Sequence, residues 1–156
     1  MERGLYSVIL YFGIFIALLM TPQRLQAALG ENTNSVESDR RAISAARENV
    51  SAFSNYTVHA ISSHATTIRE YVSQDGIVFG VAWNGLIHPD LTPLLGSYAG
   101  EYREALLQAP RLHGRRHFEV KAQHVVVEKW GHMRNHRGRA YIPSLMPTGV
   151  STDDIK

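Results

Sequence analysis

Hydrophobic and polar residues alternate along three consecutive stretches in the middle of the chain, at residues 56–61, 66–73 and 77–83. A period of two residues is typical of β-strands with one buried and one solvated face. An Asp-Gly pair at 75–76 separates the second and third stretches, and both residues tolerate the positive φ angles of a tight hairpin. The pattern predicts a three-stranded antiparallel meander, and Gly80 inside the third strand indicates a β-bulge or a close backbone approach.

Two other segments carry helical patterns. Ser35 can cap a helix over residues 36–48, which has only a thin apolar stripe and should lie on the surface. Residues 90–108 repeat leucine and tyrosine at spacings of three and four, with Asp90 as the N-cap candidate. Pro110 ends this second helix, which we expect to pack on the sheet.

A second β region follows the helix. Residues 117–129 and 138–142 read as a C-terminal hairpin across a glycine-bearing turn. The order helix, three strands, helix, two strands predicts an α+β domain, in which an antiparallel sheet carries its two helices on one face.

The first residues resemble a targeting segment rather than part of the fold. Arg3 precedes an uncharged apolar run at 5–20, which is shorter than the roughly 20 residues that cross a bilayer as a helix. This layout predicts that residues 1–27 are a signal peptide, cleaved after Ala27. The mature protein would be a single domain at 28–156, periplasmic or secreted, whereas an uncleaved N-terminal anchor is the alternative.

Composition narrows the function classes. The 156 residues include no cysteine, which excludes a disulfide scaffold, a disulfide-linked partner, a thiol nucleophile and a cysteine zinc site. The 16 basic and 14 acidic residues nearly balance, but they are unevenly placed, since residues 111–139 hold eight basic and two acidic ones. This stretch predicts an electropositive surface for phosphate, lipid head groups or acidic glycan.

We expect this basic surface to contact an anionic envelope component, or an envelope or secreted protein. The candidate contact residues are Arg115, Arg116, Arg134, Arg137, Trp83 and Trp130. The two tryptophans could line a groove for a glycan or a peptide. A solvated basic face without a ligand is the alternative. No nucleic-acid-binding motif accompanies the basic residues, so nucleic acid is not expected as a partner.

Histidine spacing raises a metal site as another alternative. His113 and His117 are four residues apart, as are His132 and His136, a spacing that puts two imidazoles on one face of a helix. Neighbouring arginines would repel a cation, and Gly114 disfavours a helix there. Surface histidines are the simpler interpretation, and we expect no cofactor.

The motifs of common enzyme classes are absent from the sequence. It contains no HExxH, P-loop or dinucleotide-binding glycine motif, and Ser97 is misplaced for a G-x-S-x-G nucleophile. A periplasmic enzyme acting on an envelope glycan or peptide would have to combine distant residues, such as Glu70, Asp90 and a histidine. We therefore expect a binding domain, with no catalytic residue assigned.

Three stretches, 68–85, 89–98 and 131–155, resemble a small family of exported Gram-negative proteins known as domain of unknown function 2844. The matching pattern consists of Arg69-Glu70-Tyr71-Val72, Gly76, Val78-Phe79, Trp83, Pro89-Asp90-Leu91 and Leu95-Gly96-x-Tyr98. The chain departs from the family pattern at Glu31 and Leu86, where glycine and proline are usual. The resemblance implies export and supplies no activity, cofactor or catalytic residue. The expectation is a non-enzymatic domain, accessory to the envelope or to secretion.

Overall fold

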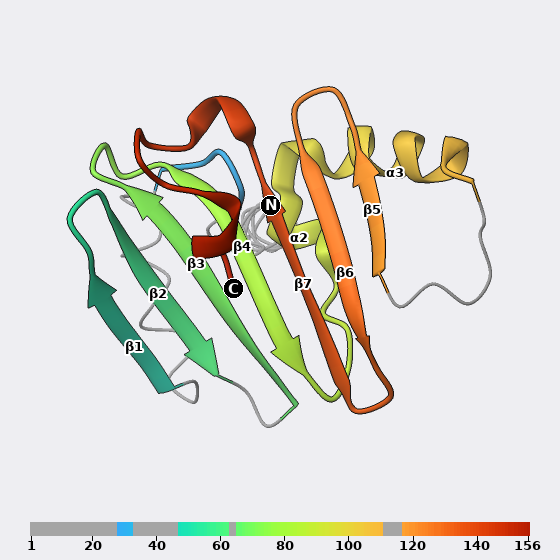
Figure 1. Ribbon diagram of the computed structural model, residues 1–156, viewed down its shortest axis with the longest axis horizontal. Helices are drawn as coiled ribbons and strands as arrows, with labels where there is room; N and C mark the ends of the chain where they lie inside the picture. The colour runs from blue at the N-terminus through green and yellow to red at the C-terminus, as the bar shows by residue number, and fades with distance from the viewer. Residues whose placement is uncertain (1–27, 33–46, 63–64, 111–116) are drawn as a thin grey trace, which may run out of the picture.

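The computed structural model describes residues 28–32, 47–62, 65–110 and 117–156, and its strands form one antiparallel sheet. Figure 1 shows this seven-stranded sheet, in the order β1-β2-β3-β4-β7-β6-β5, with a helical segment behind it. The strands are β1 (Arg47–Ala52), β2 (Tyr56–Ser62), β3 (Thr66–Ser73), β4 (Val78–Gly85), β5 (His117–Lys121), β6 (Val126–His132) and β7 (Asn135–Tyr141). The helical elements are α2 (Leu91–Leu95), η2 (Gly96–Tyr98), α3 (Ala99–Gln108), η3 (Pro143–Leu145) and η4 (Thr152–Asp154).

The predicted α+β arrangement, a three-stranded meander plus a separate C-terminal hairpin with two helices, is wrong. Strand β7 pairs directly with β4, with Val81 opposite Ala140. The seven strands therefore form one sheet, and the fold is mostly β. The stretch at 117–129 is two strands, because the chain reverses where the Ala122 N–H donates to the Val125 carbonyl at 2.9 Å. A stretch of 13 residues with valines spread along it fits one strand or two, and only the pairing decides between them.

The prediction of a helix at 36–48 is also wrong for residues 47 and 48, the part that the structure describes. Arg47 and Glu48 open strand β1, and residues 36–46 lie outside the described residues. Strand β1 pairs with β2 in register from Arg47 opposite Ser62 to Ala52 opposite Thr57. The hydrogen bonds of this pairing outweigh a weak local helix propensity.

Several local predictions are confirmed. Strands β2, β3 and β4 occupy the three alternating stretches, and the turn at 75–76 places Gly76 at a φ of 77°. The register between β3 and β4 shifts after Tyr71, which lies opposite Gly80, and Phe79 is the extra residue of a β-bulge. The helical segment runs over residues 91–108, and the Asp90 carboxylate caps it by accepting the Thr92 N–H at 2.9 Å.

One hydrophobic core lies between the sheet and the helical segment. Its fully buried members include Leu29, Val78, Val81, Leu95 and Val127. The Leu29 N–H donates to the Leu94 carbonyl at 3.0 Å, which fastens the segment at 28–32 to the helix. Within the described ranges, no helix has the length and apolar character needed to cross a bilayer.

The opposite face of the sheet is partly covered by residues 143–156, called the C-terminal segment below (Figure 1). Ile155 is fully buried in a second cluster with Tyr71, Phe79 and Tyr141. Gly80 makes room for it, because an added Cβ would lie 2.9 Å from the Ile155 Cδ1 atom. The C-terminal segment therefore shields the middle of this face and leaves the rest open.

Candidate functional site

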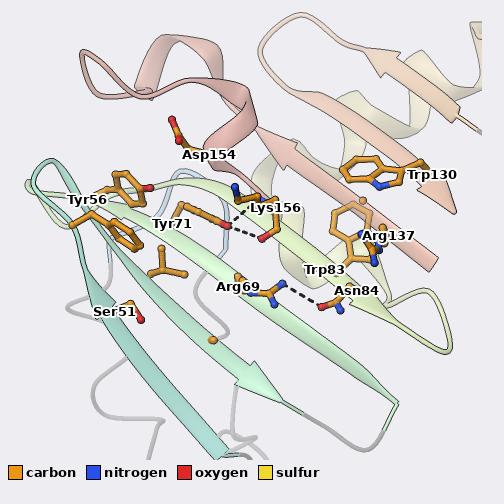
Figure 2. Close-up of a pocket in the computed structure, with 14 residues that line it drawn as sticks. Ser51, Tyr56, Arg69, Tyr71, Trp83, Asn84, Trp130, Arg137, Asp154 and Lys156 are labelled. Atoms are coloured by element: carbon orange, nitrogen blue, oxygen red, sulfur yellow. Dashed lines mark hydrogen bonds between the residues drawn. The ribbon is translucent and has the colours of Figure 1, made fainter. Parts of the chain in front are cut away.

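An open trough of about 630 Å³ crosses the sheet face beside the C-terminal segment (Figure 2). Its lining residues come from strands β1, β2, β3, β4, β7 and β6 and from the end of the C-terminal segment. They are Ser51, Phe53, Tyr56, Val58, Ala60, Arg69, Tyr71, Trp83, Asn84, Trp130, Arg137, Gly138, Asp154 and Lys156.

The strand registers explain why these side chains share one face. Residues directly opposite each other in an antiparallel pair point to the same side of the sheet. Ala60 lies opposite Arg69, Asn84 lies opposite Arg137, and Arg137 lies opposite Trp130. Residues far apart in sequence are therefore aligned across the strands as one surface.

Aromatic rings form one end of the trough. Phe53 stacks on Tyr56 with ring centroids 4.7 Å apart and planes at 15°. Tyr56 in turn meets Phe79 edge to face at 6.0 Å. Because Phe53 is 53% exposed, this end offers a flat apolar surface to solvent.

Two guanidinium groups and an indole ring form the other end. Arg69 donates from Nη1 to Asn84 Oδ1 at 3.2 Å, and Arg137 donates from Nε to Asn135 Oδ1 at 3.1 Å. Within the described part of the chain, neither guanidinium has a carboxylate partner. Figure 2 places Arg69 and Arg137 on either side of Asn84, with Trp130 above Arg137.

The C-terminal segment forms the wall of the trough, and hydrogen bonds fix its end. The Tyr71 hydroxyl donates to the Lys156 carbonyl at 2.8 Å and accepts the Lys156 N–H at 2.9 Å (Figure 2). The Asp154 carboxylate accepts the Ser151 N–H at 2.8 Å and the Ser151 hydroxyl at 3.1 Å. These bonds lower the pKa of Asp154, so this carboxyl stays ionised as part of a cap.

A buried network anchors the same segment to the sheet. Glu128 accepts two hydrogen bonds from Arg139, at 2.9 and 3.1 Å, and one from the Tyr141 hydroxyl at 3.2 Å. Arg139 also donates from Nη1 to the carbonyl of Thr152, within the C-terminal segment. Burial raises the pKa of Tyr141 to about 12, helped by the adjacent Glu128 charge. The network holds the wall of the trough in place.

Of the predicted contact residues, Trp130 and Arg137 lie in the trough. Trp83 also borders it, but its side chain is 2% exposed and packs over Gly138 in the helix-side core. Arg134 lies in the exposed β6–β7 turn. The two remaining arginines, Arg115 and Arg116, lie outside the described residues.

The predicted histidine pairs have separate neighbours, and His113 lies outside the described residues. His117 Nε2 is 3.6 Å from Glu128, and His132 Nδ1 is 3.3 Å from the Met133 carbonyl oxygen. The His136 ring lies 4.6 Å from that of His88. Among the described residues, no group of three or more histidine or carboxylate side chains is arranged to hold a metal ion.

The two carboxylates considered for catalysis lie outside the trough. Glu70 is buried on β3, and Asp90 caps α2, so neither lines the trough. Sequence reasoning missed Arg69, Asn84 and the Phe53–Tyr56 stack. The alternating pattern along β3 places Arg69 and Tyr71 on one face, but it does not indicate which strands lie beside them.

A comparison with curated proteins and one with solved structures gave no match to this chain. A comparison with family models did give one. The model described as Protein of unknown function (DUF2844) matches residues 25–155, and the chain therefore belongs to that family.

Proposed function

We propose that this chain is a non-enzymatic binding domain of an exported protein, and that it holds an acidic polysaccharide of the cell envelope in the trough. One observation carries the proposal. The partly exposed Trp130 ring lies opposite Arg137, and Arg69 lines the same open channel from β3; neither guanidinium has a carboxylate partner among the described residues. The signal-peptide pattern of residues 1–27 supports the export part of the proposal.

The shape of the trough favours a polymer. It is lined from β1 through β2, β3, β4 and β7 to β6, which makes five strand spacings. At about 4.8 Å each, these spacings add up to roughly 24 Å. A channel of this length, open along its side, suits several consecutive units of a chain better than one small molecule.

Its charge favours an acidic ligand. Guanidinium groups match carboxylate and phosphate oxygens with paired hydrogen bonds, and Arg69 and Arg137 both face the trough. Asn84 lies between them and can donate to a hydroxyl or a carboxylate through its amide. A uronate or a phosphorylated sugar supplies both kinds of group.

Its walls favour sugar over peptide. The exposed Phe53 ring and the partly exposed Trp130 ring both line the trough and can pack against the apolar C–H faces of pyranose rings. An extended peptide usually gains affinity by pairing with a sheet edge. The trough crosses the strands instead, over backbone groups that already pair within the sheet.

Titration calorimetry with an oligogalacturonate and a neutral cello-oligosaccharide of equal length tests the proposal. We expect binding of the acidic chain alone. Trp130→Ala should weaken it about ten-fold or more, and so should Arg69→Gln or Arg137→Gln. Lys121→Gln is the matched control, because Lys121 is a cation on β5 that does not line the trough.

Three outcomes would contradict the proposal. Equal binding of the neutral oligosaccharide would show that the arginines do not select an acidic ligand. Cleavage of the oligosaccharide during incubation would show an enzyme. Recovery of a stoichiometric protein partner by crosslinking in cells, lost in Arg137→Glu, without binding of acidic oligosaccharide would indicate a protein ligand instead.

A further inference from the structure

Two loops at one end of the sheet expose large apolar side chains side by side. Leu86 and Ile87 follow β4 and are 53% and 59% exposed. Met133, in the β6–β7 turn, is 88% exposed. These three residues are called the apolar tip below. Leu86 and Arg134 line one shallow hollow, which shows that the two loops are neighbours.

The backbone holds both loops firmly in these positions. The Leu86 N–H donates to the Ala65 carbonyl at 2.7 Å, and the Thr66 hydroxyl donates to the Ile87 carbonyl at 3.0 Å. In the other loop, His132 pairs with Asn135, so Met133 and Arg134 form a two-residue turn. The apolar side chains are therefore presented outward by a fixed scaffold.

Positive charge lies close to Met133 of the apolar tip. Residues 131–137 contain Arg134 and Arg137 and no aspartate or glutamate, and the acidic residue that follows Ile87, Asp90, is the cap of α2. Arg134 is exposed beside Met133, and it adopts a left-handed φ of 65°. Apolar side chains backed by cations are the pattern by which proteins dock on anionic lipid surfaces.

A second exposed apolar pair lies among charges of both signs. Leu106 and Leu107 on α3 are 38% and 77% exposed. Arg103 and Glu104, which precede this pair on the same helix, are also exposed. Around Met133, by contrast, the charged residues within four positions are all basic, which makes this loop complementary to an anionic surface.

We infer that the apolar tip docks this domain on an anionic phospholipid bilayer, with Leu86, Ile87 and Met133 entering the head-group region and Arg134 meeting lipid phosphates. This inference does not rest on the proposed function of the trough. The tip is formed by loops at the end of the sheet, and its three residues do not line the trough. A membrane surface would hold the domain next to envelope polymers while leaving the sheet face open.

Because the chain has no cysteine, one residue can be labelled selectively in the full-length protein. An environment-sensitive fluorophore on Met133→Cys should shift to the blue on vesicles containing phosphatidylglycerol, and quenchers in the bilayer should reach it. Leu107→Cys is the matched control, since it is also exposed and apolar, and its fluorophore should stay solvent-like. This local readout does not depend on whether residues 1–27 also contact the bilayer.

Partition measurements give the second readout. In the labelled chain, Leu86→Ser with Ile87→Ser should reduce the vesicle-bound signal about ten-fold or more, and Arg134→Gln should reduce it about five-fold. Leu106→Ser with Leu107→Ser should leave it unchanged, and so should Trp130→Ala.

Two results would overturn the inference. A fluorophore at 133 that stays solvent-like on anionic vesicles would exclude insertion. A blue shift that depends on protein concentration without vesicles would show that a second copy of the chain covers the tip. Because trough variants do not alter the tip, failure here leaves oligosaccharide binding to be judged separately.

Discussion

Glu128 on β6 anchors the C-terminal segment, and Glu128→Gln tests how much this anchor contributes to stability. The carboxylate is buried and accepts two hydrogen bonds from Arg139 and one from Tyr141. Arg139 links it to the carbonyls of Thr152 and Ile155, the second at 3.5 Å. The substitution keeps the side-chain volume and removes the charge, so it isolates the electrostatic contribution.

The structure sets the size of the expected loss. Breaking a buried ion pair by removing one partner destabilises a protein by about 3–5 kcal/mol. Glutamine keeps one acceptor oxygen, and Arg139 keeps its two backbone acceptors. We therefore expect the lower end of the range, about 3 kcal/mol, which lowers Tm by about 10 °C in a domain of this size.

The loss should also depend on pH. Burial by itself raises the pKa of Glu128, but the hydrogen bonds and positive charge of Arg139 outweigh it and leave the pKa below its ordinary value. A carboxyl with a lowered folded-state pKa contributes its stability above the unfolded-state pKa and loses it as the pH falls through the folded-state value. The difference between parent and variant should be largest near neutral pH and shrink below about pH 4.

Urea unfolding, followed by tryptophan fluorescence at neutral and acid pH, measures both effects. Glu119→Gln is the matched control, because Glu119 lies opposite Glu128 on β5 and pairs at 3.2 Å with exposed Lys121. The control should lose less than about 1 kcal/mol. A loss in Glu128→Gln no greater than in the control, or one unchanged at acid pH, would refute the reasoning.

Other predictions concern glycines and a tyrosine. Gly138→Ala should destabilise the domain by about 2–3 kcal/mol in thermal unfolding, because an added Cβ would overlap the Trp83 ring and lie 2.6 Å from the Glu128 carbonyl oxygen. Gly100→Ala should instead stabilise it by about 0.5 kcal/mol, since nothing lies within 4 Å and alanine favours the helix. With its pKa raised to about 12 by burial and by Glu128, Tyr141 should remain protonated in an ultraviolet titration past the ordinary tyrosine range. The parent and the Tyr141→Phe variant should therefore show the same change in tyrosinate absorbance near pH 10.

Local features of the fold could be predicted because neighbouring residues determine them. Alternation along β3, the Asp-Gly turn and the Asp90 cap each depend on a few residues close in sequence. The pairing of β4 with β7 could not be predicted in this way. It joins segments separated by the whole helical segment, and many apolar strands would satisfy the same pattern.

The candidate site shows the same division. The many basic residues at 111–139, together with Trp130, indicated part of the trough. A count of basic residues, however, includes ones that are already paired with carboxylates. Arg139 is engaged with Glu128, whereas Arg69, outside the basic stretch, reaches the trough through β3. Only the strand order brings Arg69 and Arg137 to opposite sides of Asn84.

Chemical-shift mapping with an acidic oligosaccharide tests the central claim most directly, because it locates the ligand on the sheet. The account predicts that an oligogalacturonate shifts the Trp130 indole N–H and the amides of Arg69, Asn84 and Arg137, while α3 stays unchanged. Shifts confined to α3 or to the loops outside the trough, or no shifts at all, would contradict the claim that the trough is a binding site for acidic glycan.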